Sequence, residues 1–165
     1  MSDTRPPTAH ATHTIAPQTI ALGADHAGYP LKSRIKALLE ADGHHVRDLG
    51  TNGLQRVDYP DFASKVAASV AEGEVHYGIL ICGTGIGMSI AANRNPLVRC
   101  ALAHDTTTAR LGRAHNDANI LALGARTTGE DEAMDAVRVF LATPFEGGRH
   151  AIRVNKLGDP RSQRS

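Results

Sequence analysis

The segment Tyr77–Cys82 and the glycine-rich stretch after it constrain the fold more than any other part of the chain. Tyr-Gly-Ile-Leu-Ile-Cys is an almost continuous apolar run, which is typical of a strand buried on both faces of a parallel sheet. Gly83-Thr-Gly-Ile-Gly87 predicts a turn, and residues 88–93 predict the start of a helix. A buried strand that turns directly into a helix is the building unit of an α/β protein.

The same alternation of strand and helix patterns continues through the chain. Short apolar runs predict four further strands, at residues 19–23, 45–49, 98–103 and 119–123. Amphipathic spacing predicts five further helices, which begin at Pro30, Asp61, Thr106, Glu130 and Arg149. We therefore expect a five-stranded parallel sheet with helices on both faces, a three-layer Rossmann-like α/β sandwich. Right-handed crossovers place the carboxyl ends of all strands at one edge, which is where such sheets bind ligands.

The length of 165 residues suits one domain. Residues 1–18 are rich in Thr, Pro, Ala and His without periodicity, so we expect a disordered N-terminal tail. The single domain is then expected over residues 19–158, with a C-terminal tail over 159–165.

Charge and cysteine content exclude several classes of protein. The net charge of +1 gives no basic excess for nucleic acid or a membrane surface. The two cysteines, Cys82 and Cys100, each lie in an apolar run, which suits a reducing compartment better than a secreted disulfide scaffold. No stretch has the apolar length of a membrane span or the core of a signal peptide. We expect a soluble, cytoplasmic protein.

Three polar segments follow predicted strands and should meet at the ligand-binding edge: Asp25-His26, Cys82 to Gly87, and His104-Asp105. Alternate glycines leave the Cys82 turn without side-chain cover, so its N–H groups and the following helix start favour an anion or a developing oxyanion. Burial raises the pKa of a cysteine thiol in such a position, whereas amides and a helix end lower it.

The residues of this turn also permit other interpretations. Cys82 can be a buried structural cysteine beside a tight turn. Gly83-x-Gly85 followed by Asp105 resembles a dinucleotide-binding pattern, although the third glycine, Gly87, gives G-x-G-x-G and not G-x-G-x-x-G. The cysteines and histidines show no close pairs of metal ligands, so no metal site is expected.

Two further clusters lie late in the chain. His115-Asn116-Asp117 is expected in a connection between a helix over residues 106–113 and the fifth strand. It offers a proton-transfer group and an amide donor, but such residues also cap helices for backbone reasons alone. Arg149 and Arg153 share a helix face and, with His150 and Lys156, form a basic patch that can bind phosphate or be merely solvated. Arg126 follows the fifth strand at the ligand edge and can join this patch.

Taken together, these motifs resemble the ribose-5-phosphate isomerase type B family, which also contains the galactose-6-phosphate isomerase subunits. The resemblance covers about residues 20–157 and rests on six segments in family order: Gly23-Ala-Asp-His-Ala-Gly28, Asp58-Tyr-Pro-Asp61, Gly78-Ile-Leu-Ile-Cys-Gly-Thr-Gly-Ile-Gly87, Ser89-Ile-Ala-Ala-Asn93, His115-Asn-Asp117 and Glu146-Gly-Gly-Arg-His150.

The resemblance implies a role for each cluster in an aldose–ketose isomerase. Cys82 would move the proton between C2 and C1, Thr84 would help to move the hydroxyl proton, and His115 would open the furanose ring. The enediolate would be stabilised by Asn116 and by the turn residues Gly83, Gly85, Ile86 and Gly87. Sugar contacts would come from Asp25, His26 and Tyr59, and phosphate contacts from Arg126, Arg149 and Arg153.

The resemblance further implies a cofactor-free enzyme that interconverts D-ribose 5-phosphate and D-ribulose 5-phosphate, a step of the pentose phosphate pathway. Allose 6-phosphate, galactose 6-phosphate or a tetrulose phosphate are alternative substrates, and a non-catalytic nucleotide-binding module is a more distant alternative. Family members are homodimers or homotetramers that share the active site between subunits. The terminal basic helix would then reach its partner's site.

Overall fold

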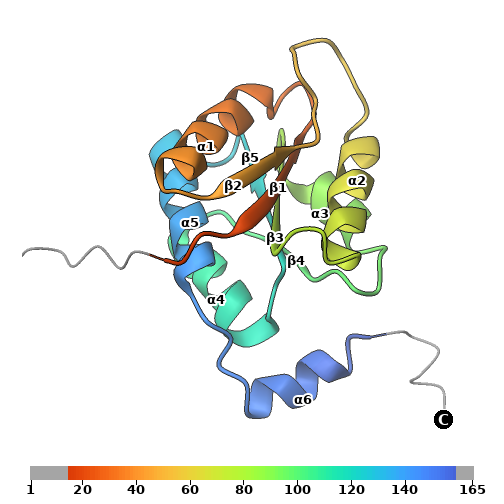
Figure 1. Cartoon of the computed structure of the whole chain (residues 1–165). Helices are drawn as coiled ribbons and strands as arrows, with labels where there is room; N and C mark the ends of the chain where they lie inside the picture. The colour runs from red at the N-terminus through yellow and green to blue at the C-terminus, as the bar shows by residue number, and fades with distance from the viewer. Residues whose placement is uncertain (1–14, 159–165) are drawn as a thin grey trace, which may run out of the picture.

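The computed structural model describes residues 15–158 as a five-stranded parallel sheet with helices on both faces (Figure 1). In spatial order the strands run β2-β1-β3-β5-β4, so β3 is central. Their bounds are β1 (Thr19–Ala24), β2 (His45–Asp48), β3 (Tyr77–Cys82), β4 (Cys100–Leu102) and β5 (Ile120–Gly124). The helices are α1 (Tyr29–Ala41), α2 (Tyr59–Ala71), α3 (Ile86–Ala92), α4 (Thr106–Asn116), α5 (Glu130–Ala142) and α6 (Arg149–Asn155).

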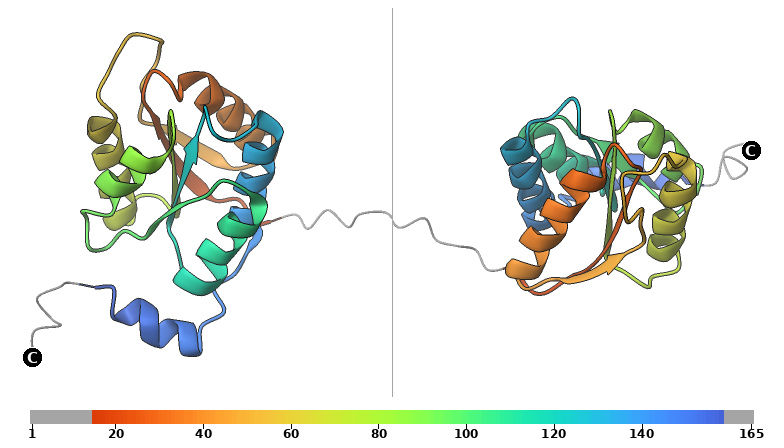
Figure 2. Two further views of the ribbon diagram at one scale, coloured as in Figure 1. Left: turned by 180° about the vertical axis from the view of Figure 1, so that it is seen from behind. Right: turned by 90° about the horizontal axis from the view of Figure 1, so that it is seen from above.

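Alternating side chains of the sheet divide the core between its two faces. On one face, residues such as Ile79 and Leu121 pack against α1, α4 and α5. On the other, Leu80 and Ala122 pack against α2 and α3. Seen from above, the two helix layers enclose the sheet (Figure 2). The predicted three-layer α/β fold is therefore confirmed.

Helix α6 lies apart from this sandwich. It packs against α4 at the foot of the molecule, whereas the loops that follow β1 and β2 lie at the top (Figures 1 and 2). It follows Gly147 and Gly148, which have φ values of 65° and 54°. Glycine adopts positive φ more readily than other residues, and this pair turns the chain away from α5.

Most predicted element boundaries agree with the structure to within a few residues, and two differences affect function. The fourth strand is shorter than predicted, because only Cys100–Leu102 pairs with β5. The fourth helix runs through to Asn116 and ends where Asp117 adopts a left-handed φ of 46°. His115 and Asn116 therefore lie on the last turn of α4 and not in a loop.

Predictions for residues 1–14 and 159–165 lie outside the described part of the chain. Residues 15–18, predicted as tail, pack on the domain: Ile15 contacts the core and the Gln18 N–H donates to His44 Nδ1 at 3.1 Å. No helix within residues 15–158 combines the length and apolarity needed to cross a membrane.

Candidate active site

The carboxyl ends of β1, β3 and β5 meet in the middle of the sheet. Ala24 is paired with Ile81, and Cys82 with Gly124. Hydrogen bonds continue beyond the strands: the Asp25 N–H donates to the Ile81 carbonyl at 3.2 Å, and the Arg126 N–H donates to the Gly83 carbonyl at 2.9 Å. The sheet thus brings Asp25, Cys82 and Arg126 to one place, although 101 positions separate Asp25 from Arg126 in sequence.

Cys82 is the last residue of β3 and its side chain is buried on the α2–α3 face. The Gly85 N–H donates to its Sγ at 3.1 Å, and this hydrogen bond stabilises the sulfur when it carries negative charge. Gly85 makes the contact with a φ of 76°, and a Cβ there would lie 2.9 Å from the Leu123 carbonyl carbon. The turn therefore requires glycine for its geometry and presents its amides to the thiol.

Two backbone N–H groups at the start of this turn, those of Gly83 and Thr84, are left unpaired within residues 15–158. Thr84 Oγ1 is near the next amide, since it accepts from the Ile86 N–H at 3.3 Å. Unpaired N–H groups beside a cysteine form a site that can hold an oxyanion.

Two of the predicted site residues, Arg126 and Tyr59, lie against glycines of this turn. A Cβ on Gly83 would lie 3.3 Å from a terminal nitrogen of Arg126, so the guanidinium lies over this glycine. A Cβ on Gly87 would lie 2.6 Å from the Tyr59 ring, which is itself 41% exposed. The bare glycine backbone therefore admits both an aromatic ring and a cation to the site.

Asp25 and His26 form the wall contributed by β1. Asp25 is buried, and its Oδ1 accepts from the Gly28 N–H at 2.9 Å, which fixes the start of α1. His26 Nδ1 accepts from the Val57 N–H at 3.3 Å and so ties the 50–57 loop to the site. This bond leaves the other ring nitrogen of His26 available to a ligand.

The remaining predicted residues lie at the opposite edge of the sheet. Helix α4 starts at the carboxyl end of β4 and runs back, so His115 and Asn116 lie near the amino end of β5. Arg149 and Arg153 are on α6, which packs against α4. Within one chain, the end of α4 and the whole of α6 therefore lie apart from the carboxyl ends of β3 and β5 (Figure 1).

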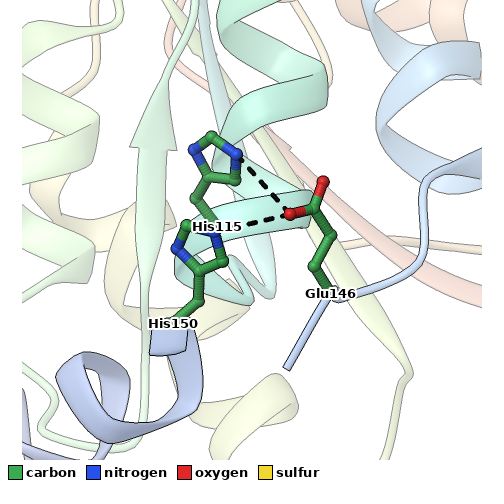
Figure 3. Close-up of side chains that lie close together, drawn as sticks. All are labelled: His115, Glu146 and His150. Carbon is green, nitrogen blue, oxygen red and sulfur yellow. Dashed lines mark ion pairs between the residues drawn. The ribbon is translucent and has the colours of Figure 1, made fainter. Parts of the chain in front are cut away.

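A close group at this second edge was missed by the sequence analysis. His115 Nε2 and His150 Nε2 lie 3.8 and 3.4 Å from the same carboxylate oxygen of Glu146 (Figure 3). The two imidazole rings are stacked, with centroids 4.2 Å apart and planes 8° from parallel. The spacing of Glu146 and His150, four residues apart, was the only sequence signal, because His115 joins them through the α4–α6 contact. The expectation that histidines form no close pairs of possible metal ligands is therefore wrong for His115, Glu146 and His150.

The second cysteine has a different environment from the first. Cys100 lies on β4 beside a cavity of about 430 Å³ that Asn116 also lines. Burial raises the pKa of its thiol from 9.0 to about 12, so it stays protonated near neutral pH. Cys82 is thus the cysteine whose surroundings suit proton transfer.

Comparison with known proteins identifies close relatives over nearly the whole described chain. The model of the "Ribose/Galactose Isomerase" family matches residues 20–157. Ribose-5-phosphate isomerase B of Escherichia coli is 48% identical over 138 residues, which are 84% of this chain and 93% of the relative. D-erythrulose-4-phosphate isomerase of Pectobacterium atrosepticum is 40% identical over 141 residues, 85% of this chain and 93% of the relative.

Solved structures agree with these sequence relatives. Ribose-5-phosphate isomerase B of Clostridium thermocellum superposes with a TM-score of 0.86 at 51% identity, covering 89% of this chain and 99% of that one. The enzyme of Thermotoga maritima gives a TM-score of 0.84 at 48% identity, with 86% and 97% covered.

Proposed function

This chain belongs to the ribose/galactose isomerase family, and we propose that it interconverts D-ribose 5-phosphate and D-ribulose 5-phosphate through an enediolate. One structural observation supports the proposal. The buried Cys82 Sγ accepts a hydrogen bond from the Gly85 N–H, and the neighbouring Gly83 and Thr84 N–H groups have no partner within residues 15–158. A proton shift between adjacent carbons needs a base beside an oxyanion site, and this turn supplies both.

In the proposed reaction Cys82 removes the proton from C2 of the open-chain aldose. The electrons of that C–H bond form the C1–C2 double bond, and negative charge moves onto O1. The Gly83 and Thr84 N–H groups are placed to stabilise this charge, each donor being worth about 10²–10³ in rate in enzymes that use such sites. Thr84 Oγ1 assists transfer of the O2 proton to O1, and Cys82 returns its proton to C1 to give the ketose.

Binding of the substrate is proposed for the groups around the turn. In this proposal Arg126 binds the phosphate, and Asp25, His26 and Tyr59 contact the sugar. Support comes from the position of these side chains around the Cys82 turn. Contacts to the phosphate, remote from C1 and C2, orient the reacting carbons over Cys82. The established chemistry of a 1,2-proton shift calls for no redox cofactor in this scheme.

We further propose a homodimer, or a tetramer built from dimers, in which each site takes residues from two chains. His115 would open the furanose ring, Asn116 would assist at the oxyanion, and Arg149 and Arg153 would add to phosphate binding, all from the partner. Support comes from their position at the far edge of the sheet and from the way α6 stands off the sandwich (Figure 2). Exposed apolar side chains on or beside α3 and α6 offer an interface: Ile86, Ile90, Leu97, Ile152 and Leu157.

A cytoplasmic location is proposed from the cysteines. Cys82 and Cys100 are both free thiols, and the proposed chemistry of Cys82 requires a reduced sulfur.

Replacement of the base tests the reaction directly. We expect Cys82→Ala to lower kcat for ribose 5-phosphate by at least about 10³-fold, since general-base catalysis contributes about 10²–10⁴ and no neighbouring group replaces the sulfur. Unfolding in urea should stay cooperative, and Cys100→Ala serves as the matched control with near-normal activity. Activity of Cys82→Ala close to that of the parent enzyme would refute the assignment.

A second substrate deserves measurement because one relative is named D-erythrulose-4-phosphate isomerase. Values of kcat/KM for four-, five- and six-carbon aldose phosphates would rank the sugars. Preference for ribose 5-phosphate is expected, and a clear preference for a tetrose or hexose phosphate would change the substrate without changing the chemistry.

A further inference from the structure

Two residues from the start of α6 and the segment before it lie against His115. Glu146 lies at the Nε2 edge of the imidazole, and His150 lies on the face of the ring. Glu146 precedes α6, and its backbone N–H donates to the Ala114 carbonyl at 3.0 Å, which holds it next to the end of α4. His150 is the second residue of α6 and stacks flat on the His115 ring (Figure 3). The local fold therefore fixes both neighbours of His115 before any substrate binds.

The burial and charge of these side chains differ sharply. The His150 side chain is 9% exposed, and its Nε2 has no hydrogen-bond partner within the described chain. Burial lowers the pKa of His150, and His115, Arg149 and Arg153 lower it further against an opposing effect of Glu146. The lowered pKa of His150 favours the neutral form of its ring. The His115 side chain is 37% exposed and its free face can meet a ligand.

A metal ion fits this group less well than a proton does. Lone pairs of an imidazole lie in the ring plane, and the two planes here are stacked and 8° from parallel. The two Nε2 lone pairs therefore lie in separate, nearly parallel planes, and an ion between the rings at about 2.0–2.1 Å from both nitrogens would lie outside both planes. A carboxylate beside the two Nε2 atoms is instead an arrangement that can select a tautomer and stabilise an imidazolium.

We propose that Glu146 and His150 are positioning residues for His115. Glu146 directs the Nε2 edge of His115 toward its own carboxylate, so that Nδ1 faces the substrate, and the stacked His150 ring holds the imidazole plane. This inference rests on the proposed function, in which His115 opens the furanose ring. There the proton leaves the anomeric O1 hydroxyl, the C1–O4 bond breaks, and O4 receives a proton. His115 accepts one proton and delivers one, so its own charge is restored.

The chemistry of the two sugars isolates this step. Ribose 5-phosphate closes a furanose ring through O4 and must be opened. Ribulose 5-phosphate carries its phosphate on O5, the oxygen that a ketofuranose would need, so it is already open. When enzyme is in excess and its turnover outruns spontaneous ring opening in water, a defect in ring opening slows the reaction that starts from ribose 5-phosphate. The reaction from ribulose 5-phosphate is then spared, because its open-chain product can leave the enzyme and close in water afterwards.

The experiment compares single-turnover rates in both directions, with enzyme in excess over substrate, for Glu146→Gln, His150→Ala, His150→Phe and His115→Ala. We expect Glu146→Gln and His150→Ala to lower the single-turnover rate constant from ribose 5-phosphate by about tenfold or more, part of the 10²–10⁴ typical of proton transfer. The rate from ribulose 5-phosphate should change less than about threefold. His150→Phe keeps a flat apolar ring and should recover much of the loss.

Controls separate the possible failures. Glu40→Gln and His45→Ala change exposed residues of the same types on α1 and β2, and should alter neither direction. Sedimentation velocity should give the parent assembly for every variant. Equal loss in both directions for Glu146→Gln and His150→Ala, or no loss, would overturn the positioning role. Equal loss in both directions for His115→Ala would instead refute ring opening by His115, and thus the proposed function of that residue.

A second readout does not depend on turnover. Nitrogen chemical shifts of the His115 imidazole report which ring nitrogen carries the proton. We expect mainly the Nε2–H form in the parent protein and a mixed or reversed population in Glu146→Gln. An unchanged tautomer in Glu146→Gln would contradict the role given to the carboxylate.

Discussion

At the scale of single residues, the two cysteines show how position decides reactivity. Cys82 ends a central strand, and its sulfur accepts an amide N–H from the turn it begins. Cys100 lies on the short edge strand β4, and burial raises its pKa to about 12. The proposed role in proton transfer therefore belongs to the cysteine at the end of β3, whereas the cysteine on β4 stays a neutral thiol near neutral pH.

The raised pKa of Cys100 makes a prediction about stability at alkaline pH. The unfolded thiol ionises near 9.0 and the folded thiol near 12, so the unfolded state releases its proton first and is favoured as pH rises between these values. In a Cys82→Ala background, Cys100→Ala should therefore gain stability relative to its parent by up to about 1.4 kcal/mol per pH unit in this window. Urea unfolding from pH 7 to pH 11 measures the difference, which should be constant below about pH 8. A constant difference throughout would contradict the raised pKa.

At the scale of elements, contacts of a buried arginine hold the end of α4 in place. The buried Arg113 guanidinium donates to Asp117 Oδ1 at 2.8 Å and to the Ala118 carbonyl at 2.7 Å. It also lies 5.0 Å from the centre of the Tyr77 ring. These contacts fix the helix terminus that presents His115 and Asn116.

Loss of this anchor should affect stability and activity together. We expect Arg113→Ala to lower the free energy of unfolding by about 3 kcal/mol, because it removes one partner of a largely buried ion pair and its packing. The kcat/KM for ribose 5-phosphate should fall as well, since the end of α4 loses its fixed position. Arg110→Ala, on an exposed site of the same helix, should change the unfolding energy by less than about 0.5 kcal/mol. Equal stability of the two variants in urea would show that Arg113 does not anchor the helix.

At the scale of the whole molecule, the residues assigned to one reaction lie at two opposite edges of the sheet. Parallel strands joined by right-handed crossovers place each strand's end and the following helix's end at opposite edges. A site that needs both Cys82 and His115 is therefore complete only when a second chain brings its α4 and α6 to the first chain's turn.

Mixing two inactive variants tests this arrangement. Cys82→Ala and Arg149→Ala each damage both sites of their own dimer, but a mixed dimer holds one site with neither change. Random exchange of subunits should restore about one quarter of the parent activity, because half of the dimers are mixed and each has one intact site of two. Refolding the variants together and separately provides the comparison. Activity no higher than that of the separate samples would contradict shared sites.

Local patterns of the chain were enough to predict the sheet, its parallel sense and the Cys82 turn. Apolar runs and helix spacing act between neighbours in sequence, so the order of strands and helices could be seen without coordinates. Asp25, Cys82 and Arg126 could also be assigned to one edge, because every strand of a parallel sheet ends there.

Only the tertiary structure decided where the other half of the proposed site lies and what surrounds it. The length of α4 depends on Asp117 and Arg113 at its end, and that length carries His115 to the far edge of the sheet. The stacking of His115 on His150 and the approach of Glu146 arise from packing between α4 and α6, which no periodicity records. The Cys82 turn was thus determined by its own residues, whereas its separation from His115 within one chain follows from the direction in which a helix must run after a parallel strand.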